Sequence, residues 1–251
     1  MFNLFVQAFN HAMPTSTATP TALRRRAPLR PPSGLRAARA EPARPDRKAD
    51  ILLAAEKLFA QRGYHAVTIR EIATEAGVPL ALVGYYYGPK HELFHAIFAH
   101  WNSTIEERLH ALRAIDIDPQ DATTLPRIVD AFTGPVLRLR ASSEGEYYAL
   151  LVARELYHLQ EETDRVMRAY FDPLALAFIE ALSISLPHAT RAQVAWCYQF
   201  ALGALLHHIS DTRVERLSNG ESKAGDPAAA GLLTAFIVGG FRAALPVTPL
   251  R

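Results

Sequence analysis

Apolar residues recur every three or four positions through most of the chain, which is the spacing of one buried helix face. Few segments alternate as strands do, and Gly and Pro gather at the ends and joints. The predicted fold class is therefore all-α, with a kink expected at Gly134-Pro135. Helices are predicted over about 46–62, 68–77, 80–86, 90–113, 122–141, 146–160, 162–184, 189–210 and 227–244.

Residues 68–90 predict two short helices joined by a tight turn. Thr68 fits an N-cap, and Glu71 follows three residues later, where its carboxylate can reach back to the N–H of Thr68. Gly77 can end the first helix because it enters the left-handed region without a Cβ penalty, and Pro79 presets φ for the second. This is the layout of a helix-turn-helix, whose second helix enters the major groove of DNA.

The segment 51–94 also carries three sequence marks: AAxxLFAxxGY, TIREIAxxAGV, and an aromatic run followed by G-x-K-x-x-L-F. It resembles the N-terminal DNA-binding domain of TetR-type repressors. The resemblance implies a three-helix DNA-binding domain over 46–93 and a helical ligand-binding and dimerisation domain over 94–251. Beyond 94 the chain matches that family only in its length and helical character.

Helical spacing identifies the surface that would read DNA. Val83 and Tyr87 face the domain interior, and the opposite face is apolar. That face suits thymine methyl groups better than bidentate polar readout. The family often has an aromatic or amide residue at the position of Gly84 and a Ser or Thr cap at that of Pro79, so this chain departs at both. The face consists of Leu80, Ala81, Gly84 and Tyr85, with Leu82 and Tyr86 beside it.

Tyr85 and Tyr86 are the strongest candidates for side-chain contacts to DNA, the alternative being that they only pack the domain. Lys90, with the free N–H groups of a helix start, would form an anion site for a phosphate. Thr68 and Arg70 are further phosphate candidates, although Arg70 could equally be a plain surface arginine.

Charge is divided unevenly along the chain. The net charge is +2, but residues 1–45 hold seven arginines against one acid, so the other 206 residues carry −4. The DNA-binding segment is balanced, and charge placement rather than bulk charge must attract DNA. Residues 1–45, rich in Pro, Ala, Thr and Arg, are predicted to be disordered. Two alternatives stay open for them: a start codon assigned too far upstream, or an arginine tract that holds phosphates non-specifically.

Metal, cofactor and catalytic signatures are weak. His91 and His95 are four residues apart, and His207 shares a helix with Cys197, but no established metal-ligand spacing occurs. The sequence also contains no phosphate-binding loop or cofactor fingerprint, so we expect no metal, no cofactor and no enzyme. The single cysteine favours a reducing cytoplasm, and no uninterrupted apolar run of membrane-spanning length occurs.

Aromatic residues crowd the helices of the C-terminal domain, as in an apolar cavity with a few polar anchors, although most aromatics at helical spacing simply form a core. The ligand candidates are Tyr148, Arg154, His158, Met167, Phe171, Trp196 and His207. Two stretches, AWCYQFALGALLHHI and AAAGLLTAFIVGGFRAAL, are apolar and rich in Ala and Gly, which allows close helix packing. The resemblance implies that they form a four-helix dimer interface, whereas a single-chain core would have a similar composition.

The sequence thus predicts a homodimeric regulator whose partners are double-stranded operator DNA and a small-molecule effector, most simply a repressor that the effector releases. The effector would bind between the helix 90–113 and the region 146–184 and tilt the DNA-binding domains. Two other classes stay open: an architectural DNA-binding protein without an effector, and an enzyme built on a helical body.

Overall fold

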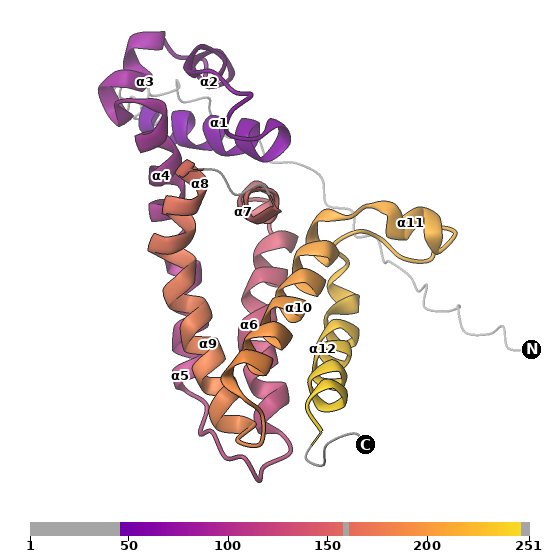
Figure 1. Ribbon diagram of the computed structural model, residues 1–251. Helices are drawn as coiled ribbons and strands as arrows, with labels where there is room; N and C mark the ends of the chain where they lie inside the picture. Colours follow the sequence, from indigo (N-terminus) through magenta and orange to yellow (C-terminus); the bar gives the residue numbers. More distant parts are fainter. Residues whose placement is uncertain (1–45, 158–160, 247–251) are drawn as a thin grey trace, which may run out of the picture. The chain divides into compact units, whose positions relative to one another are not determined.

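A computed structural model describes residues 46–157 and 161–246 and confirms the all-α fold: every regular element in these ranges is helical (Figure 1). The predicted disorder of residues 1–45 and the ligand candidate His158 lie outside the described residues. The helices are α1 (Arg47–Arg62), α2 (Ile69–Glu75), α3 (Leu80–Tyr87), α4 (Lys90–His100), α5 (Asn102–Arg113), α6 (Thr124–Ala141), α7 (Glu146–Tyr157), α8 (Glu161–Val166), the π-helical turn η1 (Met167–Phe171), α9 (Asp172–Ser185), α10 (Arg191–Ser210), α11 (Arg213–Leu217), the 3-10 turn η2 (Pro227–Ala229) and α12 (Ala230–Ala244).

The head of the molecule, α1 to α3 with the start of α4, forms around its own apolar core. Ile51, Phe59, Ile72, Val83 and Phe94 have no exposed surface, and they come from all four helices. Their burial fixes which face of each short helix points outward. The head core continues into the body through residues of α7, which packs against α1.

Local signals end and begin these helices as predicted. The carboxylate of Asp46 accepts hydrogen bonds from the N–H groups of Lys48 and Ala49 and so caps α1. Thr68 and Glu71 form the predicted capping box: the Thr68 N–H donates to Glu71 Oε2 at 2.8 Å, and the Glu71 N–H donates to Thr68 Oγ1 at 3.3 Å.

Gly63 ends α1 in a conformation that requires glycine. Its φ is +84°, and a Cβ built there would lie 2.9 Å from Nε of Arg154 in α7. The positive φ is what favours glycine at this turn, and the Arg154 side chain packs close to it.

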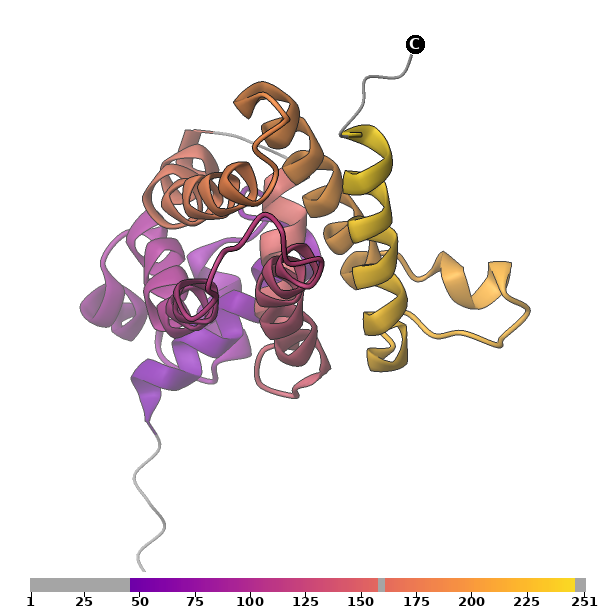
Figure 2. The ribbon, with the colours of Figure 1, turned by 90° about the horizontal axis from the view of Figure 1, so that it is seen from below.

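The body is a bundle of α5, α6, α9, α10 and α12, with α7 between the bundle and the head (Figure 1). Seen from below, α12 lies on the outer side of the bundle (Figure 2). It contacts both α6 and α10. The second apolar cluster fills the interior of this bundle.

Three segments differ from the predicted elements. The predicted helix 90–113 is two helices, because the Trp101 carbonyl accepts from both the N–H and the hydroxyl of Thr104, at 3.0 and 2.8 Å, and starts a new helix. The predicted helix 162–184 is α8, η1 and α9: Pro173 has no N–H for the carbonyl four residues earlier, and the helix widens into a π turn before it. The predicted loop 211–226 contains the short helix α11.

Candidate DNA-binding surface and effector cavity

The outer face of α3 is exposed along its whole length. Val83 is fully buried, and the Tyr87 hydroxyl donates to the carbonyl of Lys48 at 2.8 Å, so these two hold α3 against α1. On the opposite side Tyr85 is 79% exposed, and its ring meets that of Tyr86 edge to face at 5.2 Å. The structure thus brings together on one surface Leu80, Ala81, Gly84, Tyr85 and Tyr86.

The start of α2 carries the next two candidates. The Thr68 hydroxyl donates to Glu71 Oε2 at 2.7 Å, and Arg62 forms an ion pair with the same carboxylate at 2.8 Å. Hydrogen bonds lower the pKa of Glu71 to about 2; those from Thr68 have the largest effect, and the one from Arg62 has a smaller effect. Thr68 therefore caps the helix in the free protein, while the neighbouring Arg70 is exposed.

Lys90 makes contacts within the protein that the sequence did not predict. Its Nζ donates to the Val67 carbonyl at 2.8 Å and lies 4.2 Å from the centre of the Tyr64 ring. Burial lowers the pKa of Lys90. The ammonium group thus ties the start of α4 to the turn before α2, and whether it also contacts a phosphate stays a prediction.

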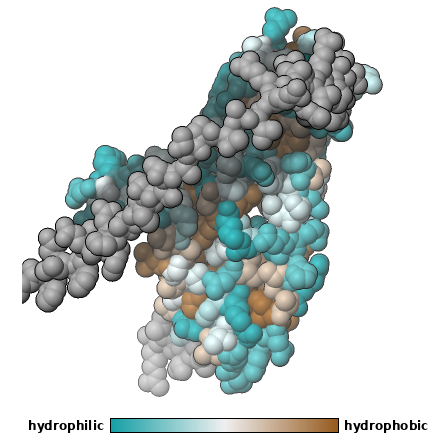
Figure 3. Space-filling view, turned by 180° about the vertical axis from the view of Figure 1, so that it is seen from behind, coloured by the Kyte–Doolittle hydropathy of each residue, from teal (hydrophilic) through white to brown (hydrophobic). Residues whose placement is uncertain are grey.

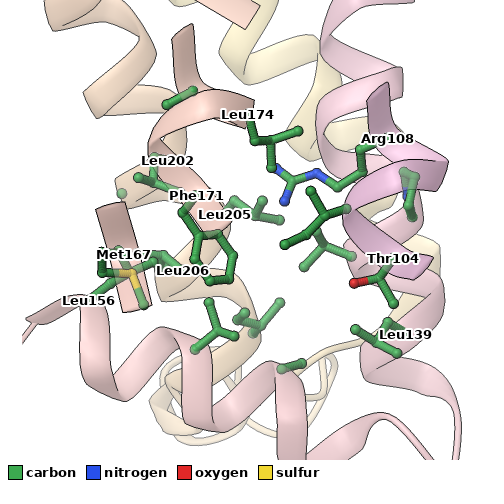
Figure 4. Close-up of a pocket in the computed structure, with 18 of the residues that line it drawn as sticks. Thr104, Arg108, Leu139, Leu156, Met167, Phe171, Leu174, Leu202, Leu205 and Leu206 are labelled. Carbon is green, nitrogen blue, oxygen red and sulfur yellow. The ribbon is translucent and has the colours of Figure 1, made fainter. Parts of the chain in front are cut away.

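A cavity of about 410 Å³ lies in the body, within the usual range of small-molecule sites (Figure 4). Its wall is formed by α5, α6, α7, α8, η1, α9 and α10. Of the predicted ligand residues, Tyr148, Met167 and Phe171 line it, and the π turn carries the last two. A second hollow, between α1, Trp101 and residues 143–147, is lined by several charged side chains and is not an apolar enclosure.

Three other predicted ligand residues lie away from this cavity. Arg154 points to the head, where its Nη1 donates to the Gln61 carbonyl at 3.4 Å. Trp196 is 65% exposed on the outside of α10. His207 is exposed and faces Asp211 at 3.2 Å, one turn further along. Helical spacing marked these residues as belonging to the right helices but did not fix the face that each helix turns to the cavity.

The sequence reasoning missed Arg108, which lines the cavity and is only 7% exposed. A signal was present, because Arg108 follows Ile105 by three residues and precedes Leu112 by four. An arginine in an apolar stripe of a helix is buried when the stripe is buried.

The cavity wall is joined to the head by aromatic packing. Phe98 of α4 lies edge to face with Tyr148 and with Phe171, at 5.8 and 6.2 Å between ring centres. Trp101 stacks on Tyr148 at 5.4 Å, and its Nε1 donates to Oε2 of Glu56 in α1 at 2.7 Å. A movement of the Tyr148 ring would therefore be transmitted to α4 through Phe98 and to α1 through Trp101.

A second joint is built on Glu155, which is buried in α7. One carboxylate oxygen accepts from the N–H of Tyr64 in the head at 3.3 Å, and the other accepts from the hydroxyl of Thr163 in α8 at 2.7 Å. Arg154 and Glu155 are thus contacts between the head and the body.

Large apolar side chains remain exposed along α10 and α12. Trp196 and Phe200 are each 65% exposed and stack at 5.9 Å, while Leu232 and Phe236 of α12 are 74% and 70% exposed. In the view from behind, apolar surface is visible across the middle of the body (Figure 3). We call these four side chains the α10–α12 face. By length and composition the segment 227–244 could also cross a membrane, a test that core helices of soluble proteins pass as well.

The fold and its two sites define a class of protein in which a helix-turn-helix head is joined to a helical body that contains a cavity. Two family models agree with this assignment. "Bacterial regulatory proteins, tetR family" matches residues 51–97, and "Tetracyclin repressor-like, C-terminal domain" matches residues 130–240. The chain belongs to the tetR family of bacterial transcriptional regulators.

Individual relatives are similar over part of their length. The HTH-type transcriptional regulator HbdR of Aromatoleum sp. (strain CIB) is 31% identical over 94 residues, which is 38% of this chain and 34% of HbdR. The HTH-type transcriptional activator FasR of Mycolicibacterium smegmatis is 36% identical over 90 residues, which is 36% of this chain and 41% of FasR. The matched segment thus spans about a third to two-fifths of these relatives.

A solved TetR-like transcriptional regulator from Rhodococcus sp. RHA1 shares the fold over most of both chains. Its TM-score is 0.54 at 24% identity, and the match covers 81% of this chain and 98% of that protein. The body is therefore built like a known regulator body although its sequence has diverged.

Proposed function

We propose that the protein is a homodimeric transcriptional regulator that reads operator DNA through α3 and is controlled by a small molecule in the body cavity. The observation that carries the proposal is the outer face of α3, where five residues are exposed on a helix fixed by Val83 and Tyr87. In a helix-turn-helix this is the surface that enters the major groove. Such a protein acts in the cytoplasm, where it meets DNA.

Dimerisation is proposed through the α10–α12 face. Four large apolar side chains that are each at least 65% exposed form a surface of the kind that marks protein–protein contacts. A two-fold pair of α10 and α12 makes a four-helix interface and places two heads on one DNA face. Half-sites are then read one DNA turn apart, about 34–36 Å between the recognition helices.

An effector role for the cavity is favoured over a purely architectural role by the cavity itself. A protein that only bends or coats DNA needs no cavity of about 410 Å³ in its body. Relatives' names include both an activator, FasR, and a repressor, Rv3405c of Mycobacterium tuberculosis. We propose repression relieved by the effector, since a ligand that favours one spacing of the heads weakens binding at the other.

Selection of bound duplexes from a random DNA pool, followed by footprinting of the selected sequences, tests DNA reading directly. The proposal predicts a palindromic site whose halves are protected one helical turn apart. Selection of no sequence above the starting pool would contradict it.

Tyr85→Phe is expected to weaken binding to the selected operator by roughly 1 kcal/mol, about fivefold in Kd, because one hydrogen bond to DNA is lost. The side chain is 79% exposed, so the thermal unfolding midpoint should not change. Fluorescence anisotropy at fixed salt gives the Kd, and unchanged affinity would remove Tyr85 from the DNA-contacting surface.

A further inference from the structure

Arg108 is a buried cation in the wall of an apolar cavity. It lies on α5, is 7% exposed, and its guanidinium lies over the rings of Phe132 at 5.0 Å and Phe178 at 5.9 Å. Its Nε is buried, and the structure gives it no hydrogen-bond partner among the residues it describes. Figure 4 shows the side chain reaching from α5 toward Leu174 across the cavity.

The protein itself supplies no counter-charge to this guanidinium within residues 46–157 and 161–246. The ionisable groups that face it are the hydroxyls of Tyr148 and Tyr198, and burial raises the pKa of both, so they are neutral near pH 7. The two carboxylates at the cavity are Asp164, which pairs with Arg168 at 2.8 Å, and Asp172, which is exposed; neither forms an ion pair with Arg108. A buried charge without a partner is costly, and an anionic ligand would remove that cost.

The wall that holds Arg108 also contains a second buried polar group. The Tyr148 hydroxyl is also buried and without a hydrogen-bond partner in the described part of the chain. The rest of the wall is dominated by apolar side chains, among them Met167, Phe171, Leu202 and Leu206. The cavity thus offers one guanidinium and the unpaired Tyr148 hydroxyl in a largely apolar wall, which also holds the polar side chains of Thr104, Tyr198 and Gln199.

We propose that this cavity binds an organic monocarboxylate with an apolar body, its carboxylate held by Arg108 and the Tyr148 hydroxyl. The inference rests on the proposed function of the cavity as the effector site and names the chemical class of the effector. A planar guanidinium matches a carboxylate, and one buried positive charge balances one negative charge. A phosphate dianion would leave a negative charge unpaired, and a neutral ligand would leave Arg108 unpaired.

The test compares matched probes on the full-length protein by isothermal titration calorimetry below micellar concentrations. Decanoate and 4-phenylbutyrate supply the carboxylate on an aliphatic and an aromatic body, decanol and 4-phenylbutanol are the neutral counterparts, and decyl phosphate is the dianion. At least one carboxylate is expected to bind roughly tenfold or more tightly than its alcohol, as a charge-assisted hydrogen bond in a buried site allows. Decyl phosphate is expected to bind more weakly than decanoate.

Arg108→Met should abolish the preference for the carboxylate, because it keeps an unbranched apolar stem and removes the charge. Arg138→Met is the matched control: Arg138 is exposed on α6 and already paired with Glu107 at 2.7 Å, so its loss should leave the preference intact. Replacing an unpaired buried arginine by an apolar side chain is not expected to lower the unfolding midpoint. If Arg108→Met nevertheless fails to fold, the proposal is tested by the unmodified protein alone, through the ratio of its affinities for each carboxylate and the matched alcohol.

A ratio below threefold for both pairs, failure of both carboxylates to bind, a preference that survives Arg108→Met, or tighter binding of decyl phosphate would each overturn the proposal. Operator binding measured with the same probes separates this failure from failure of the proposed function. Release of operator equally by alcohol and carboxylate would overturn the carboxylate assignment and leave the regulator standing. An Arg108-dependent carboxylate site that never alters operator affinity would support the assignment and contradict the effector role.

Discussion

Phe236→Glu is expected to make the protein monomeric at micromolar concentration and to remove measurable operator binding. Phe236 is 70% exposed on the α10–α12 face, which also exposes Leu232, Trp196 and Phe200. Burying one large apolar side chain contributes about 1.5–3 kcal/mol, and a two-fold interface counts the loss twice. The introduced carboxylates would also lie near each other without a cation to pair with.

Analytical ultracentrifugation measures the mass, and anisotropy measures operator affinity in the same buffer. Leu176→Glu is the matched control, since Leu176 is 55% exposed on α9, away from the α10–α12 face. That variant should stay dimeric. A dimeric Phe236→Glu protein, or a Leu176→Glu protein that dissociates as readily, would assign the interface to another surface.

Glu56→Gln is expected to stabilise the protein at pH 8 by up to about 3 kcal/mol and to change little at pH 5. Glu56 is 1% exposed, and burial raises its pKa from 4.5 to about 7, against the opposing effect of the Trp101 hydrogen bond. Glutamine is neutral at every pH and keeps an oxygen that can accept from Trp101.

The sign follows from proton binding. Between pH 4.5 and 7 the folded chain holds a proton on Glu56 and the unfolded chain does not, so the free energy of unfolding falls as pH rises through that range. Urea unfolding at pH 5, 6, 7 and 8 should show this slope in the unmodified protein and a smaller slope in Glu56→Gln. Glu75→Gln, which removes only an exposed ion pair with Lys57, should shift stability by at most about 1 kcal/mol. A slope that persists in Glu56→Gln would assign the titration to another group.

Features set by neighbours along the chain were predictable from the sequence. The cap at Thr68, the end of α1 at Gly63 and the inward turn of Val83 each depend on a few adjacent residues. The division of α3 into an inner and an outer face needed only the helical period. The resemblance over 51–94 then identified the family to which the whole chain belongs.

Features set by tertiary contacts were not predictable in this way. Lys90 lies at a helix start, as an anion site requires. Its ammonium group, however, donates a hydrogen bond to the carbonyl of Val67, 23 residues earlier. Arg154 has the chemistry of a ligand anchor, yet α7 turns it toward Gln61. Arg108 was not among the predicted ligand residues, although it lies at helical spacing between Ile105 and Leu112. Periodicity shows that a side chain is buried but not what it faces.

We propose that the cavity and the DNA-binding surface are coupled through α4, Trp101 and Tyr148. The most direct test is calorimetry of the tightest-binding carboxylate probe, titrated into the full-length protein with and without saturating operator. A hundredfold coupling corresponds to about 2.7 kcal/mol, and linkage requires operator to weaken probe binding by the same factor by which the probe weakens operator binding. We expect operator to weaken probe binding, and the probe to weaken operator binding, by the same factor. This factor should exceed about fivefold, the lower end of typical coupling. Equal probe affinities with and without operator would contradict it, even for a protein that proves to bind both.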